Sequence, residues 1–174
     1  RRAVSFDAFG PPEVLEITER PDPVAGPGEV VVRVAASTVN PTDLLMRGGA
    51  QADLMTALAP PYVAGMEFSG TIESVGAGVT LAPGTRVIGV VNPRRPAGGA
   101  HSERVAVPAA SIAPLAEGID LVAAATVPMN ALTAMLALEL AGLARGQSLL
   151  VTGGAGMLGG YAVRLACHAG LRVV

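Results

Sequence analysis

The sequence contains no lysine and a single cysteine, Cys167, in 174 residues. Without lysine it offers no amine for a Schiff base and no phosphate-binding lysine of the Walker type. The lone cysteine excludes an internal disulfide. Charge is also sparse, because charged residues make up 15% of the chain and the formal net charge is −2. With no basic run either, we expect no nucleic-acid partner.

The chain also lacks an uninterrupted apolar run long enough for a membrane span. Hydrophobic residues make up 51% of it, which predicts a packed protein. The most apolar stretch, 121–138, is interrupted by Pro128, Asn130 and two threonines, and has no flanking charge asymmetry or aromatic belt. No charged segment followed by an apolar signal stands at the start. These absences favour a cytoplasmic protein without a membrane partner.

Neither end has the look of a natural terminus. The chain begins with Arg1 in place of methionine, and the apolar run Leu171–Val174 stops as though a strand were cut midway. We therefore expect a portion of a longer protein. On its own it should be inactive and prone to aggregate, because half of the predicted nucleotide-binding sheet is absent.

The first hundred residues predict an all-β region. Glycine and proline separate short runs rich in valine and isoleucine, a pattern typical of strands joined by tight turns. The run VVVRV at 30–34 is almost continuously apolar, which predicts a core strand buried on both faces. The predicted strands are Ala3–Phe6, Val14–Glu19, Glu29–Ala35, Glu67–Val75, Arg86–Val91 and Glu103–Val107.

After residue 120 the pattern changes to helix and strand in alternation. Segments rich in alanine and leucine predict helix over 120–141, with a break near Pro128 and a stop at Gly142. A strand over 148–152 and a glycine cluster follow, and apolar residues then recur at helical spacing over 158–169 before a second strand. Strand, turn, helix and strand in this order form half of a parallel βαβ unit.

The glycine cluster fits the phosphate-binding pattern GxGxxG through Gly154, Gly156 and Gly159, with Met157 and Leu158 between the last two. The first glycine permits a tight turn, the second lets the backbone approach a pyrophosphate, and the third allows close contact of helix and strand. These five residues are the candidate cofactor-binding turn. The alternative is a tight turn without a ligand in a chain rich in glycine.

A series of motifs then resembles the medium-chain dehydrogenase/reductase superfamily, in its zinc-free quinone oxidoreductase (zeta-crystallin-like) and enoyl reductase branch. The resemblance implies a fold of the α/β plus β class: a GroES-like β domain over 1–120, followed by the start of a Rossmann-type doubly wound parallel sheet over 121–174. The motifs, in order, are FGPPEVLEI, ASTVNPTDLLMRGG, PYVAGMEFSGTIESVGAGV, PGTRVIG, VPMNALTA and VTGGAGMLGG.

The resemblance also implies an enzyme without a metal. Zinc alcohol dehydrogenases of the superfamily hold the catalytic metal with a Cys where this chain has Asn40 and with a His where it has Met66. Glu67 alone cannot supply the three protein ligands that catalytic zinc requires. Hydride transfer to a quinone or an α,β-unsaturated carbonyl is then favoured, because conjugation spreads the developing charge. NADPH is the expected cofactor, and NADH stays open because the discriminating residues would lie beyond Val174.

By the same resemblance Asn40 and Asp43 are the candidate catalytic residues beside the nicotinamide and the substrate. Asn40 could donate a hydrogen bond to a developing enolate oxygen, and Asp43 would orient its neighbours. The alternative is that NPTD only starts a turn or a helix. Many relatives carry a tyrosine where this chain has Leu45, which puts the acceptor in doubt, and Tyr62 is better explained as a packed aromatic.

Thr133 and Asn130 resemble residues that line the cofactor cleft. The alternative for both is a hydrogen bond to the backbone one turn away on a mostly buried helix.

For the whole protein we expect a homodimer. Two other functions stay open: a non-catalytic relative of the same fold, and an enoyl reductase module of a larger synthase.

Overall fold

The computed structural model describes all 174 residues, which divide into two compact units, Arg1–Thr126 and Val127–Val174. The first unit includes the one-turn helix α2 (Leu121–Ala124), which contacts strands β3 and β4 of that unit. The units therefore divide slightly after the expected domain boundary at residue 120.

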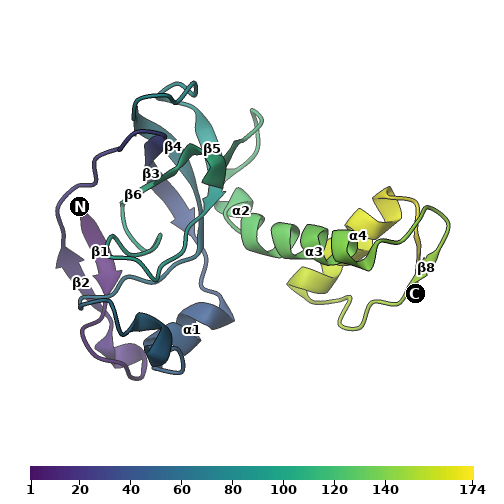
Figure 1. Cartoon of the computed structure of the whole chain (residues 1–174), viewed down its shortest axis with the longest axis horizontal. Coiled ribbons are helices and arrows are strands. Elements are labelled where there is room, and N and C mark those ends of the chain that lie inside the picture. Colours follow the sequence, from purple (N-terminus) through teal and green to yellow (C-terminus); the bar gives the residue numbers. More distant parts are fainter. The chain divides into compact units, whose positions relative to one another are not determined.

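A five-stranded antiparallel sheet forms the body of the first unit (Figure 1). Its strand order is β6-β3-β4-β5-β7, so the long strands β3 and β4 lie next to each other in the interior. A separate antiparallel pair, β1-β2, lies at the start of the chain. The strands of this unit are β1 (Arg2–Ser5), β2 (Glu16–Glu19), β3 (Glu29–Ser37), β4 (Glu67–Val75), β5 (Arg86–Val90), β6 (Arg104–Pro108) and β7 (Ile112–Pro114).

The sheet packs its apolar face into one core. The core is built from Val30 and Val32 of β3, Phe68 and Ile72 of β4, and neighbouring valines. Val31 on the opposite face of β3 is also buried, at 2% exposure, so the prediction of a strand covered on both faces is confirmed for 30–32. Arg33 is exposed, which ends that burial.

Short helices between the strands were not predicted. Helix α1 (Pro41–Arg47) follows β3, and single 3₁₀ turns cover Pro12–Val14, Ala52–Met55 and Ala109–Ser111. Met46 of α1 and Met55 pack with Phe6 and Ala64 in a second small core. Tyr62 packs against it, and its ring stacks on Phe9 with centroids 5.6 Å apart. This places Tyr62 among packed aromatics.

The second unit has the predicted order of helix, strand, glycine turn, helix and strand. Its elements are α3 (Pro128–Ala141), β8 (Ser148–Leu149), α4 (Met157–His168) and β9 (Arg172–Val173). β8 and β9 pair in parallel, which confirms the half βαβ unit. The helix break falls at Pro128, where α3 begins, and Gly142 ends α3 with a φ of 58° in the left-handed region.

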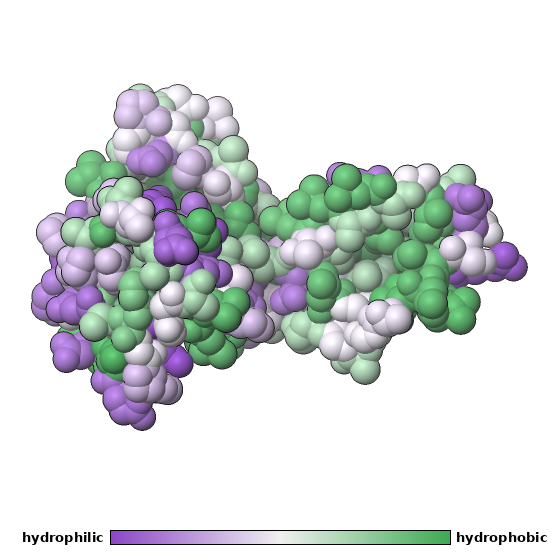
Figure 2. All heavy atoms as spheres, turned by 60° about the horizontal axis from the view of Figure 1, so that its bottom comes forward, coloured by the Kyte–Doolittle hydropathy of each residue, from purple (hydrophilic) through white to green (hydrophobic).

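The helices α3 and α4 of the second unit lie side by side (Figure 1). Their outer surface is strongly apolar (Figure 2), with Leu132, Leu136 and Leu140 of α3 and Met157 and Leu158 of α4 exposed. Even so, neither these helices nor any other in the chain combines the length and hydrophobicity that a membrane crossing would need.

The close approach of β3 and β4 generates a first prediction. A Cβ atom at Gly70 would overlap the carbonyl oxygen of Arg33 and lie 2.8 Å from a methyl carbon of Val32. Gly70→Ala should therefore lower the free energy of unfolding by about 2 to 3 kcal/mol, because the two strands must move apart. Denaturant unfolding measures this. Ser74→Ala, at an exposed position of the same strand, is the control, and equal stability of the two variants would refute the close approach.

Candidate functional site

Asn40 lies at the point where the chain turns from β3 into α1. Its backbone is extended, with φ −102° and ψ 160°, and Pro41 fills the first helical position, where a missing N–H costs nothing. The backbone N–H of Asn40 donates to Oδ2 of Asp43 at 2.8 Å. The helix start proposed for NPTD is therefore what the chain forms, and the two candidate catalytic residues lie within hydrogen-bonding distance of each other.

Asp43 is a buried carboxylate, 4% exposed, that joins two separate segments. Oδ2 accepts from Asn40 and Oδ1 accepts from the backbone N–H of Gly65 at 2.9 Å. Both oxygens thus receive backbone N–H groups, the arrangement that holds a carboxylate in one orientation. This geometry suits the orienting role expected for Asp43 better than proton transfer.

The side-chain amide of Asn40 is held by Glu67 and Thr38. Its Nδ2 donates to Oε1 of Glu67 at 3.0 Å and to Oγ1 of Thr38 at 3.1 Å. An amide nitrogen carries two hydrogens, so both are committed within the protein. A bond from Asn40 to an enolate oxygen, which stays a prediction, would therefore require one of these two hydrogen bonds to be released.

Glu67 lies at the start of β4 with 0% exposure, and the end of β3 surrounds it with hydrogen bonds. The Thr38 hydroxyl donates to Oε1 of Glu67 at 2.6 Å, and the Ser37 hydroxyl donates to the Glu67 carbonyl at 2.7 Å. A buried carboxylate needs such partners to offset the loss of water. Glu67 is thus a structural centre of the site, although the sequence presented it only as a remnant of a metal motif.

His101 joins the same region and was not expected there. Its Nε2 lies 2.8 Å from the carbonyl oxygen of Thr38, and Gly65 makes room for its ring, since a Cβ at Gly65 would lie 2.7 Å from the ring. No sequence signal shows that it contacts Thr38, because the two residues are 63 positions apart.

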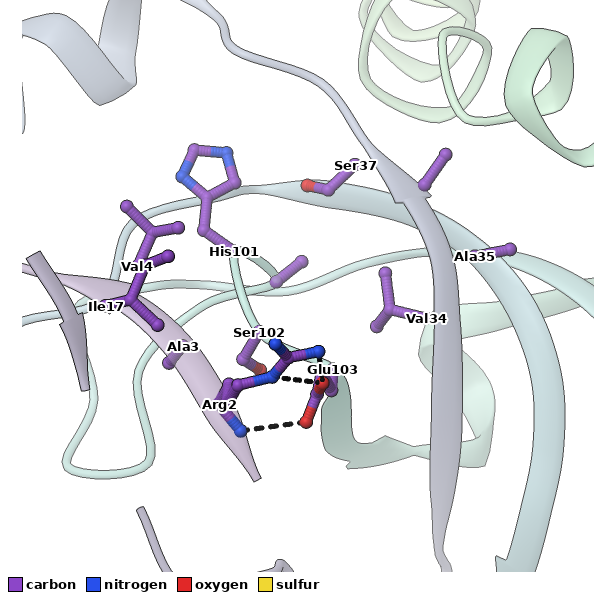
Figure 3. A pocket seen from close by; sticks show the side chains of 12 residues that line it. Arg2, Ala3, Val4, Ile17, Val34, Ala35, Ser37, His101, Ser102 and Glu103 are labelled. Atoms are coloured by element: carbon purple, nitrogen blue, oxygen red, sulfur yellow. Dashed lines mark hydrogen bonds and ion pairs between the residues drawn. The ribbon is translucent and has the colours of Figure 1, made fainter. Parts of the chain in front are cut away.

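Two cavities open beside this region and share Val4 and His101. The larger, about 440 Å³, lies between β1 and the last residues of β3 (Figure 3). Glu103 lines it and accepts from the backbone N–H of Arg2 at 2.9 Å, which lowers the pKa of Glu103. The smaller, about 280 Å³, is mostly apolar and reaches Asp43, Leu44 and Arg47 of α1. Leu45 is 47% exposed and lines neither cavity.

The donor atoms of the site do not fit a zinc ion. No group of three or more His, Cys, Asp or Glu side chains lies close enough together to hold a metal. Glu67, the carboxylate next to the two positions where zinc relatives have metal ligands, already binds Asn40 and Thr38 through its Oε1. An amide and a thioether, at Asn40 and Met66, are poor ligands for this metal.

The glycine turn in the second unit is shaped by backbone crowding. A Cβ at Gly159 would overlap the carbonyl oxygen of Gly153 and lie 2.9 Å from the Cα of Gly154. Gly156 caps α4, and Met157 and Leu158 begin the helix with their side chains exposed. A cavity of about 300 Å³, lined by Gly154, Gly156 and Met157 among others, opens at this turn. Exposed N–H groups at a helix start with an adjoining cavity fit a pyrophosphate.

Thr133 and Asn130 lie on α3, in the same unit as the glycine turn. The Thr133 hydroxyl donates to the carbonyl of Met129 at 2.7 Å, one turn back in the helix. This is the local bond that the structural alternative predicted, and it leaves the hydroxyl oxygen able to accept from a ligand.

Comparison with known proteins supplies the family context. The family model described as "Alcohol dehydrogenase GroES-like domain" matches residues 26–117. A curated relative, the pikromycin polyketide synthase component PikAII of Streptomyces venezuelae, is 37% identical over 158 residues, which are 90% of this chain and 4% of that protein.

Two solved structures resemble nearly the whole chain. A quinone oxidoreductase from Coxiella burnetii superposes with a TM-score of 0.87 at 31% identity, covering 99% of this chain and 55% of its own. A mycobacterial protein complexed with NADPH gives a TM-score of 0.81 at 30% identity, covering 99% of this chain and 52% of its own. The chain therefore spans about half the length of these solved proteins.

The double acceptor role of Asp43 generates a second prediction. In Asp43→Asn one of the two backbone donors, at Asn40 or Gly65, would face an amide NH₂ group in place of an oxygen. The free energy of unfolding should fall by about 2 to 3 kcal/mol, since a buried donor loses its charged partner. Asp53→Asn, at an exposed position, is the matched control in denaturant unfolding. If both variants were equally stable, Asp43 would not fix the start of α1.

Proposed function

Because the chain belongs to the medium-chain dehydrogenase/reductase superfamily, in the quinone oxidoreductase and enoyl reductase branch, we propose that it serves zinc-independent, NADPH-dependent reduction of quinones or α,β-unsaturated carbonyls. The observation that carries the proposal is the state of Asn40, Met66 and Glu67. Asn40 and Met66 stand where the zinc enzymes of the superfamily have metal ligands, and the Asn40 amide is hydrogen-bonded to Glu67 and Thr38.

The cofactor would be held by the second unit. Gly154, Gly156 and Gly159 would cradle its pyrophosphate, with the N–H groups of Met157 and Leu158 directed at the phosphate charge. Thr133 and Asn130 of α3 are proposed to line the nicotinamide side. When bound, the reduced nicotinamide supplies a hydride, and the residues of this chain bind and orient it. NADPH is proposed over NADH on the resemblance to an NADPH complex.

The absence of zinc ligands decides which acceptors are feasible. Zinc lowers the pKa of a bound water to about 7, roughly 12 kcal/mol of differential stabilisation, whereas one oxyanion-hole hydrogen bond supplies about 3 to 4 kcal/mol. Simple alcohols, which require an alkoxide, are therefore poor substrates here. A quinone or an enone spreads the incoming charge over its conjugated system and needs less help from the protein.

Two alternatives each have one supporting observation. The similarity to a polyketide synthase component favours an enoyl reductase module, and natural chain ends near those of a single-domain enzyme would exclude it. Leu45, which replaces a phenol common in quinone reductases, favours a non-catalytic relative. Oxidation of NADPH in the presence of phenanthrenequinone or an enone would exclude a non-catalytic role.

For the whole protein we propose a cytoplasmic homodimer.

Cofactor binding is the third prediction. The intact protein should bind NADPH, and Gly156→Val should weaken binding by about a hundredfold or more, because the side chain occupies the space through which the pyrophosphate approaches. Quenching of protein fluorescence or calorimetric titration measures both, with NADH titrated in parallel. Gly78→Asn, in an open turn of the first unit, is the control, and it should bind NADPH as the wild-type protein does. Absence of NADPH binding by the wild-type protein would refute the proposal.

Independence from zinc is the fourth prediction. Reduction of quinone should survive dialysis against a chelator, and elemental analysis should find far less than one zinc per chain, because no donor set holds the metal. A zinc alcohol dehydrogenase treated in the same way provides the positive control. Loss of activity on chelation, restored by added zinc, would contradict the proposal.

A further inference from the structure

His101 is the one titratable side chain that lines both of the cavities described above. Their volumes, about 440 and 280 Å³, are close to those of small-molecule sites, which measure about 300 to 1,000 Å³. All of their lining residues belong to the first unit. In Figure 3 the His101 ring lies on the Val4 side of the larger cavity, apart from the paired Arg2 and Glu103.

The two ring nitrogens of His101 have different surroundings. Nε2 lies 2.8 Å from the carbonyl oxygen of Thr38. Because a carbonyl oxygen only accepts hydrogen bonds, Nε2 must carry a hydrogen, and in the neutral ring Nδ1 then has a lone pair. Nδ1 has no hydrogen-bond partner in the protein. It is not enclosed either, since Nε of Arg1 is the only buried side-chain nitrogen or oxygen without a partner.

The neighbouring backbone fixes the ring in this orientation. The N–H of His101 donates to the carbonyl of Ala64 at 3.0 Å, and the carbonyl of His101 accepts from the N–H of Val4 at 2.9 Å. Gly65 lies against the ring edge, where a Cβ would be 2.7 Å from Cδ2 of His101. Turning the ring over would replace the bond from Nε2 to Thr38 with a C–H group. Nδ1 is therefore held as the open nitrogen.

The other charged side chains of the two cavities offer a ligand no acceptor nitrogen. Both oxygens of Asp43 already accept backbone N–H groups, and Arg2 is paired with Glu103 at 2.7 Å. Arg47, the remaining charged side chain, only donates. Nδ1 of His101 is thus the side-chain nitrogen through which these cavities can accept a hydrogen bond.

We propose that His101 is the ligand-binding residue of these cavities, and that Nδ1 of its neutral ring accepts a hydrogen bond from the hydroxyl group of an apolar ligand. The apolar body lies against Val4, Phe6 and Leu15, which line the smaller cavity. The ligand class rests on the proposed function, because the reduced acceptor, a hydroquinone or an enol, carries such a hydroxyl.

Protonation of the ring removes the preference for a hydroxyl. With a hydrogen on each nitrogen, Nδ1 donates, and it can bind a hydroxyl oxygen or a carbonyl oxygen equally well. Histidine ordinarily changes its charge between pH about 5 and about 8, where carboxylates and guanidinium groups stay charged. The charged groups that share the cavities with His101 therefore do not produce this change. They are Arg2, Asp43, Arg47 and Glu103.

The fifth prediction concerns the hydrogen on the His101 ring and needs no ligand. The chain has two histidines, so its NMR spectrum contains two imidazole rings, and the variant His168→Gln identifies which is which. At pH about 8 the His101 ring should carry its hydrogen on Nε2 alone, because the Thr38 carbonyl selects that form. His168 is exposed and should average over both forms, which provides the internal control. A hydrogen on Nδ1 of neutral His101 would overturn the proposal.

Binding of a matched pair of ligands tests the selection itself. The probes are 1-tetralol and 1-tetralone, which share a two-ring body and differ in a hydroxyl against a carbonyl. Both are titrated calorimetrically, without cofactor, at pH about 8 and about 5.5. We expect the ratio of the two affinities to favour the alcohol roughly tenfold more at the higher pH, the factor that one hydrogen bond contributes.

Two variants locate this effect on His101. His101→Gln keeps an amide N–H that can donate to Thr38 but has no ring to protonate, so the ratio should no longer change with pH. His168→Gln is the matched control and should behave as the wild-type protein does. A ratio in the wild type that does not change with pH, or one that changes equally in His101→Gln, would overturn the proposal.

Failure of this proposal can be told apart from failure of the proposed function. If the wild-type protein bound neither tetralol nor tetralone at either pH, the ligand site at His101 would be refuted, whatever the outcome of the NADPH titration. Binding of the alcohol with the expected pH dependence, in a protein that does not bind NADPH, would support the site and refute the reductase.

Discussion

The site depends on the burial of two carboxylates. A carboxylate removed from water destabilises the fold unless donors replace its hydration. Asp43 receives two backbone N–H groups, and Glu67 receives a hydroxyl and an amide. These donors come from the stretch between β3 and α1 and from the turn before β4, so the two segments are fixed relative to each other. The positions of Asn40 and Thr38 follow from that requirement.

Under the proposed function the two units would contribute different kinds of recognition. The first presents side-chain polar atoms whose directions are set by buried acceptors. The second presents bare backbone at a glycine turn, where crowding around Gly159 excludes any side chain. Backbone recognition suits a phosphate, which is the same in every nucleotide cofactor, whereas directed side chains suit the more variable reacting groups.

The sequence predicted the strands and the βαβ unit well, because their signals are local. The almost continuous apolar run at 30–34 marks β3, flanking glycines mark β3 and β4, and the glycine spacing marks the start of α4. Helix α1 was not predicted as an element, since it is only seven residues long and begins with proline. The turn or helix start expected at NPTD was correct, but short sequence patterns do not separate these two outcomes.

The chemistry of the site was less accessible from the sequence. The direction of the Asn40 amide depends on Glu67, 27 positions away, and the place of His101 depends on Thr38, 63 positions away. Hydrogen bonds of that kind form only after the sheet has brought β3 and β4 together. The residue type at position 40 shows only that an amide is present, and the tertiary structure determines which groups its nitrogen binds.

The lone thiol gives the chain a natural point of attachment for a reporter. Cys167 is exposed near the end of α4, in the unit that carries the glycine turn, and the first unit contains no sulfhydryl at all. A maleimide dye or a nitroxide would therefore label one atom of one helix without any engineered substitution. With a second label at a surface position of the first unit, energy transfer or electron spin resonance would measure the distance between the two units.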